Sequence, residues 1–143
     1  MVVTSELTRI RDEFGDELFY DPNKENQYDN TKVYIVNDGN STSVPILITD
    51  YGNTASIYSD YSYDDYVSTY KAYAVEDTTY IDSNGNQVSG YILAIKSEYG
   101  TSGNISSSYN LVNVDSLGQI DSSTWNYGAI SGYESEFVED LNE

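Results

Sequence analysis

Cysteine and histidine are both absent from this chain of 143 residues. Without cysteine the chain can form no disulfide and offers no thiol nucleophile, and without histidine it lacks the commonest general base. Zinc sites, which rely largely on these two residue types, are excluded as well. These absences remove many enzyme classes, and we expect the chain not to be an enzyme.

Cations are scarce too, with 6 basic residues against 24 acidic ones and a formal net charge of −18. No cation follows Lys96, whereas carboxylates continue to the last residue. Such a surface repels phosphate backbones and anionic lipids, so we expect no nucleic-acid partner. A run of about 18 apolar residues is also missing, so we expect no membrane insertion.

Phenylalanine and tryptophan are rare, at 3 and 1 residues, whereas tyrosine occurs 16 times. Tyrosine suits half-buried strand positions because its ring packs while its hydroxyl stays in water. Together with frequent Ser, Thr, Asn and Asp, this composition predicts an exposed β-rich module. The length fits one domain that can bury a sizeable core.

Residues 1–20 carry a helical pattern. Their apolar positions Val3, Leu7, Ile10 and Phe14 are spaced by four, three and four residues, which places them on one helical face. Thr4 or Ser5 can cap the start and Gly15 can end the helix. We predict an N-terminal helix or linker helix over residues 1–20, which packs on the domain or comes from an upstream module.

Residues 21–143 read as an antiparallel β domain that ends in a short acidic helix. Strand patterns separated by turn signals cover residues 32–36, 44–49, 54–58, 69–75, 78–82, 90–96 and 108–114. Residues 83–86, Ser-Asn-Gly-Asn, predict a tight hairpin turn. The most apolar strand, residues 90–96, is expected at the centre of a sheet and buried on both faces.

The C-terminal segment carries a capping box, Ser131 with Glu134 three residues later. Tyr133, Phe137 and Leu141 follow at intervals of four and share one helical face. The predicted fold is therefore α+β and mainly β: an antiparallel meander sheet or small sandwich with an N-terminal and a C-terminal helix.

The second half of the chain resembles a known family. Its landmarks are GYILAIK at residues 90–96, SYNLVNVDSLGQID at 108–121, Trp125 and AISGYESEFVEDLNE at 129–143. Their order is similar to the tryptophan-rich C-terminal domain modules of large secreted proteins of cyanobacteria and marine bacteria. The resemblance implies secretion, tandem modules and no catalysis. It also implies a terminal Asp-Leu-Asn-Gly-Asp-Gly string, here cut short after Asn142, so we expect a module cut from a longer protein.

Two strings of oxygen-bearing side chains are candidate calcium ligands, and calcium is the one cofactor that the sequence suggests. Asp140 and Asn142 would be the first two ligands of a calcium loop, or else a frayed acidic helix end. Asp82, Asn84 and Asn86 alternate in the same way, but they lack the glutamate that closes such a loop. A plain hairpin turn is the competing interpretation of this second string.

Residues 58–66, YSDYSYDDY, are the best candidate for a ligand surface, with Tyr61, Tyr63, Asp64, Asp65 and Tyr66 as its contact residues. Tyrosine faces can stack on sugar rings, and carboxylates can accept hydrogen bonds from sugar hydroxyls. The competing interpretation is an exposed edge strand whose charges prevent edge-to-edge aggregation.

These patterns lead to one main functional hypothesis: a non-catalytic module of a large secreted or cell-surface bacterial protein. It would act as a spacer, an adhesion unit or a glycan-binding unit, with neighbouring modules, glycans or a surface partner as its contacts. A fibre-like structural module of a phage or virion is an alternative. A small carboxylate-dependent hydrolase domain is another, because a chain with 24 acidic residues always contains a pair of carboxylates by chance.

Overall fold

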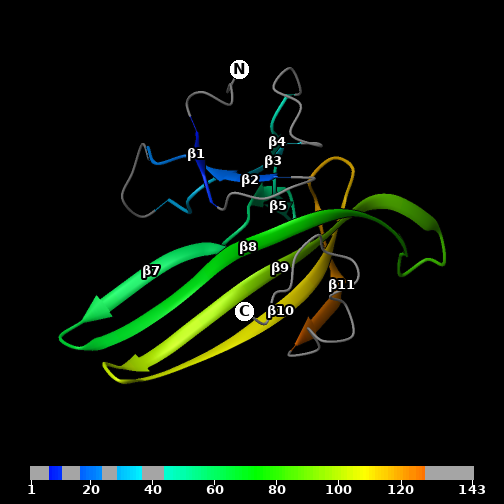
Figure 1. Ribbon diagram of the computed structural model, residues 1–143. Coiled ribbons are helices and arrows are strands. Elements are labelled where there is room, and N and C mark those ends of the chain that lie inside the picture. The colour runs from blue at the N-terminus through cyan, green and yellow to red at the C-terminus, as the bar shows by residue number, and fades with distance from the viewer. Residues whose placement is uncertain (1–6, 11–16, 24–28, 37–43, 128–143) are drawn as a thin grey trace.

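The computed structural model describes residues 7–10, 17–23, 29–36 and 44–127 (Figure 1). Every regular element in these residues is a β-strand, and no helix of membrane-spanning length occurs among them. The strands are β1 (Thr8–Arg9), β2 (Glu17–Tyr20), β3 (Val33–Val36), β4 (Ile46–Leu47), β5 (Thr49–Asp50), β6 (Asn53–Thr54), β7 (Tyr58–Tyr63), β8 (Tyr66–Ile81), β9 (Gln87–Thr101), β10 (Asn104–Asp115) and β11 (Ile120–Tyr127).

The prediction of an α+β fold with an N-terminal helix is wrong. Strands β1 and β2 occupy part of residues 1–20, and they pair antiparallel with Thr8 opposite Tyr20 and Arg9 opposite Phe19. Leu18 and Phe19 are adjacent and both buried, as in a strand covered on its two faces. Pairing with the β-branched strand β3 therefore overrides the local helical spacing. The predicted C-terminal helix, at residues 131–143, lies outside the described residues.

The larger sheet has the strand order β11-β10-β9-β8-β7, and each strand pairs antiparallel with its neighbour in the chain. Figure 1 shows this sheet bent into a half-barrel around the four-stranded sheet β1-β2-β3-β4. Register shifts interrupt the ladders between Ala72 and Ala74 and between Leu111 and Asn113. Such bulges increase local twist, which accounts for part of the curvature.

Two hairpin turns of the larger sheet share one sequence pattern, Asp-x-x-Gly-x. In the first, the predicted turn at residues 83–86 is confirmed: Gly85 has a φ of 84° and donates its N–H to the carbonyl of Asp82 at 3.0 Å. In the second, Gly118 has a φ of 94° and donates in the same way to Asp115 at 3.0 Å. Glycine occupies both positions because the left-handed region is open to it without steric cost.

The core lies between the two sheets. Its largest fully buried side chains include Ile35 and Ile48 from the N-terminal half and Leu93, Ile95 and Val112 from the larger sheet. On the other face of β9, Ile92 and Ala94 pack with Leu111 in a smaller cluster beneath Tyr73 and Tyr109. The prediction that residues 90–96 form a central strand buried on both faces is therefore confirmed for its apolar centre.

One end of the larger sheet extends beyond this core, and we name it the distal sheet. It consists of β7, residues 66–70 of β8, residues 97–101 of β9 and residues 104–108 of β10, and none of these residues is buried. Figure 1 shows the ends of these strands projecting away from the small sheet. Tyr58 and Tyr70 at the inner edge of the distal sheet pack against the core, and the Tyr58 ring stacks on Tyr20 with 4.6 Å between the ring centres. Farther out, Tyr61, Tyr63 and Tyr66 are exposed, which leaves them available for contacts with other molecules.

Candidate binding surface

The distal sheet carries a group of exposed tyrosines, Tyr61, Tyr63, Tyr66 and Tyr99, which we name the tyrosine surface. Their exposed fractions are 58%, 67%, 41% and 53% respectively. They come from three adjacent strands, β7, β8 and β9. Large aromatic side chains are costly to leave in water, so a cluster of them is a candidate contact surface.

The strand register places these rings on one face of the sheet. Tyr63 lies directly opposite Tyr66, and Tyr61 lies opposite Ser68. Ser68 in turn lies opposite Tyr99. Residues directly opposite one another in an antiparallel pair share a face, so the order Tyr61–Ser68–Tyr99 forms a cross-strand row.

Serines surround the rings in this row. Tyr99 has Ser68 on one neighbouring strand and Ser106 on the other. Because serine is small, it leaves the faces of the adjacent aromatic rings uncovered. Tyr61 and Tyr99 are two strand spacings apart, about 10 Å, which matches the length of a disaccharide better than that of a single sugar.

The turn beyond the tyrosines holds the remaining predicted contact residues. Asp64 and Asp65 form the connection between β7 and β8, and both are exposed. Asp64 has a φ of 54°, a left-handed conformation that aspartate tolerates better than most residues. The N–H of Ser102 donates to the carbonyl of Asp65 at 3.1 Å and joins the two hairpin ends.

The structure thus brings together the five residues predicted from the sequence as a ligand surface. Tyr61, Tyr63 and Tyr66 share a face, and Asp64 and Asp65 border them at the tip. It adds Tyr99, which lies far away in the sequence and which only the β8–β9 register identifies. The competing interpretation as an edge strand also holds, because β7 is the last strand of its sheet and five of its six residues are exposed.

The predicted calcium string at Asp82, Asn84 and Asn86 has a structural role. Oδ1 of Asp82 accepts the backbone N–H groups of Asn84 and Asn86, each at 2.9 Å. These bonds stabilise the hairpin turn and engage the carboxylate locally. Within the described ranges, no cluster of three or more carboxylates is arranged to hold a metal ion. Asp140 and Asn142 lie outside those ranges, so calcium binding stays a prediction.

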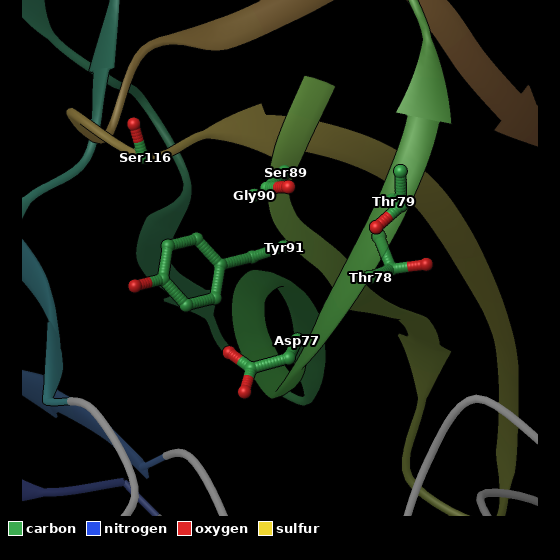
Figure 2. Close-up of a pocket in the computed structure, with 7 residues that line it drawn as sticks. All are labelled: Asp77, Thr78, Thr79, Ser89, Gly90, Tyr91 and Ser116. Atoms are coloured by element: carbon green, nitrogen blue, oxygen red, sulfur yellow. The ribbon is translucent and has the colours of Figure 1, made fainter. Parts of the chain in front are cut away.

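A polar recess lies at the opposite end of the larger sheet, where it meets the second Asp-x-x-Gly-x turn (Figure 2). Its volume is about 580 Å³, and its lining residues are Asp77, Thr78, Thr79, Ser89, Gly90, Tyr91 and Ser116. Figure 2 shows the Tyr91 ring and the Asp77 carboxylate bordering the same space, with the hydroxyls around them. Hydroxyls and one carboxylate can hold a small polar molecule, but few ring faces are available for stacking.

A second recess of about 300 Å³ lies beside this turn and is acidic. Asp82, Asp115 and Asp121 line it together with Tyr80. Burial and the negative charges of Asp121, Asp115 and Asp82 raise the pKa of the Tyr80 hydroxyl to about 12. The neutral, protonated form of the hydroxyl is therefore favoured in this recess.

No family model matches the chain, and neither the curated proteins nor the solved structures contain a match to it. The resemblance of the second half to the tryptophan-rich C-terminal domain modules therefore stays a prediction.

Proposed function

We propose that the chain is a non-catalytic, glycan-binding module of a large secreted or surface bacterial protein, and that the tyrosine surface holds the glycan. The observation that carries this proposal is the set of four exposed tyrosines on one face at the outer end of the larger sheet. Its neighbours in the chain would be further modules of the same protein.

The chemistry of the tyrosine surface favours a carbohydrate over a protein partner. A protein interface of useful strength has an apolar centre of aliphatic and aromatic side chains. Here the positions between the rings are serines, among them Ser68 and Ser106, and aspartates border the tip. Aromatic rings stack on the C–H faces of a sugar, while hydroxyls and carboxylates accept or donate hydrogen bonds to its hydroxyl groups.

The first prediction follows from this proposal and concerns Tyr61→Ala and Tyr99→Ala. Each ring supplies about 1 kcal/mol of contact, so each change should weaken polysaccharide binding about fivefold, and the double variant by about 25-fold. The measurement is affinity electrophoresis or calorimetry of the chain against a panel of neutral plant, algal and bacterial polysaccharides.

Tyr51→Asn is the matched control, because Tyr51 is also exposed but lies in the turn between β5 and β6. Tyr51 has a φ of 51°, which asparagine tolerates, so this variant removes an exposed ring at little cost in backbone strain. Equal affinity of the wild type and the Tyr61/Tyr99 double variant for every bound polysaccharide would rule the proposal out. So would a failure of the wild type to bind any of them.

A further inference from the structure

Two of the chain's few lysines lie directly opposite each other in the larger sheet. Lys71 of β8 pairs with Lys96 of β9, although the chain has only 6 basic residues against 24 acidic ones. Like charges placed opposite each other on neighbouring strands repel, so this arrangement lowers the stability of the sheet. By strand alternation, both side chains lie on the face opposite the tyrosine surface, because Lys71 is three residues from Ser68 and Lys96 is three from Tyr99.

Aromatic rings flank both lysines. The cross-strand row reads Tyr58–Lys71–Lys96–Tyr109. The Lys71 Nζ lies 5.4 Å from the centre of the Tyr58 ring, and the Lys96 Nζ lies 5.2 Å from that of Tyr73 and 5.8 Å from that of Tyr109. These are cation–π distances, and they hold the ammonium groups in place along the row.

The two lysines differ in how their charge is balanced. Lys71 forms an ion pair with Asp60 at 3.0 Å. Burial acts to lower the pKa of Lys71, but the hydrogen bond that Lys71 donates to Asp60 and nearby charges outweigh it, and the pKa is raised. Lys96, by contrast, has no ion pair with any carboxylate in the part of the chain that the structure describes. Among the described residues, its ammonium group contacts the rings of Tyr73 and Tyr109 instead of pairing with a carboxylate.

A recess of about 250 Å³ opens beside these ammonium groups. Its walls include both lysines, the rings of Tyr58 and Tyr73, and the polar side chains of Thr69 and Glu98. The space is comparable to one sugar ring. It therefore combines a positive charge, aromatic walls and a hydrogen-bonding rim in one small volume.

We propose that this recess binds a singly charged acidic sugar residue, one that carries a carboxylate or a sulfate monoester. The anionic group bonds to the Lys96 ammonium, the sugar ring packs against Tyr73, and Thr69 and Glu98 bond to ring hydroxyls. Asp60 and Glu98 lie close to the same space, so a doubly charged group such as a phosphate monoester is disfavoured by repulsion. The sugar part of this ligand rests on the proposed function, whereas the anion preference rests on the recess alone.

The second prediction tests this site with Lys96→Gln, which removes the charge and keeps most of the side-chain length. Calorimetric titrations would use three oligosaccharides: one of uronic acid residues, one of sulfated galactose residues and one of uncharged galactose residues. Loss of a charge-assisted bond should weaken binding of the acidic oligosaccharides about tenfold or more and leave the uncharged one unchanged. Added salt should also weaken the binding of the acidic oligosaccharides. The oligosaccharide that loses more affinity with Lys96→Gln should also lose more affinity with salt. Whichever acidic oligosaccharide loses more affinity identifies the anionic group.

Lys32→Gln is the matched control, because Lys32 is exposed, lies outside the recess and gives the same change in net charge. Its affinities should stay within about twofold of the wild type. Equal losses for Lys96→Gln and Lys32→Gln would overturn the site and indicate a general charge effect, and so would an absence of binding to both acidic oligosaccharides. In that case, if the binding of neutral polysaccharides still depended on Tyr61 and Tyr99, the recess proposal alone would have failed and the tyrosine surface would stand. Circular dichroism melting of each variant confirms that it is folded.

Discussion

Gly85 and Gly118 occupy the same position in two turns of one pattern, yet their surroundings differ. A Cβ on Gly85 would meet no atom within 4 Å. A Cβ on Gly118 would overlap with the carbonyl oxygen of Leu47 and press on the Ile46 side chain. Gly118 also accepts the N–H of Thr49 at 2.8 Å, so its turn joins the smaller strands to the larger sheet. Gly85 is therefore needed only for the conformation of its turn. Gly118 is also needed for the close contact between its turn and the segment around Leu47 and Thr49.

The third prediction uses this pair as a comparison. Gly85→Ala should cost about 1–2 kcal/mol, because alanine must adopt the left-handed region. Gly118→Ala bears the same strain and also forces the Leu47 backbone to move, so its total cost should exceed that of Gly85→Ala by about 1–3 kcal/mol. Urea unfolding of the two variants provides the measurement. Equal losses of stability would show that the approach of Leu47 to Gly118 does not matter.

Tyr80 lines the acidic recess, and its hydroxyl has a raised pKa. Its pKa is raised to about 12 by burial and by Asp121, Asp115 and Asp82, against an ordinary value of 10.0. The protonated hydroxyl is therefore favoured in the folded state, and this stabilisation is complete below pH 10 and lost as the pH rises toward about 12.

The fourth prediction is that alkaline titration of the wild type contains a late tyrosinate component that Tyr80→Phe removes. Asp121→Asn should shift that component to lower pH, because it removes the largest charge contribution to the raised pKa. Ultraviolet difference spectra against pH measure both effects. A Tyr80→Phe titration that coincides with the wild type at its alkaline end would contradict this assignment.

At the level of secondary structure, the hairpin turn could be predicted from the sequence, whereas the strands β1 and β2 near the N-terminus could not. The turn at residues 83–86 depends on local residues, Asp82 and Gly85, whose preferences the sequence displays directly. Leu7 and Ile10 satisfied a helical spacing, but the backbone of Ile10 instead donates to the carbonyl of Leu18 at 3.0 Å. Short apolar patterns fit both states, and here a partner strand available elsewhere in the chain decided the outcome.

The candidate binding surfaces could be predicted only where their residues lie close together in the sequence. Tyr61, Tyr63 and Tyr66 stand close together in the sequence, and their alternation indicates one face. Tyr99 and the Lys71–Lys96 pair depend on the β8–β9 register, which the bulge between Ala72 and Ala74 shifts partway along the strand. A shift of one residue exchanges the two faces of a strand, so no local pattern could reveal which side chains meet.

Across the whole molecule, the larger sheet separates two kinds of surface. The face at the tyrosine surface offers aromatic rings above serines, and the other face of the same region holds the recess of Lys71 and Lys96. The net charge of −18 favours solubility and repels other acidic surfaces, so the cation pair is a local exception to the overall potential. If both proposals hold, a glycan that contains neutral and acidic sugars would fit both faces.

The fifth prediction tests the central proposal, that the tyrosine surface is where a glycan binds, with NMR spectra of protein that carries isotope-labelled tyrosine. On addition of the polysaccharide with the highest affinity in the panel, ring signals of Tyr61, Tyr63, Tyr66 and Tyr99 should shift, because ring stacking changes their surroundings. Signals of Tyr51 and Tyr80, which lie outside this surface, should stay in place. Shifts confined to Tyr91, at the polar recess of Figure 2, or shifts at none of the four rings, would contradict the proposal.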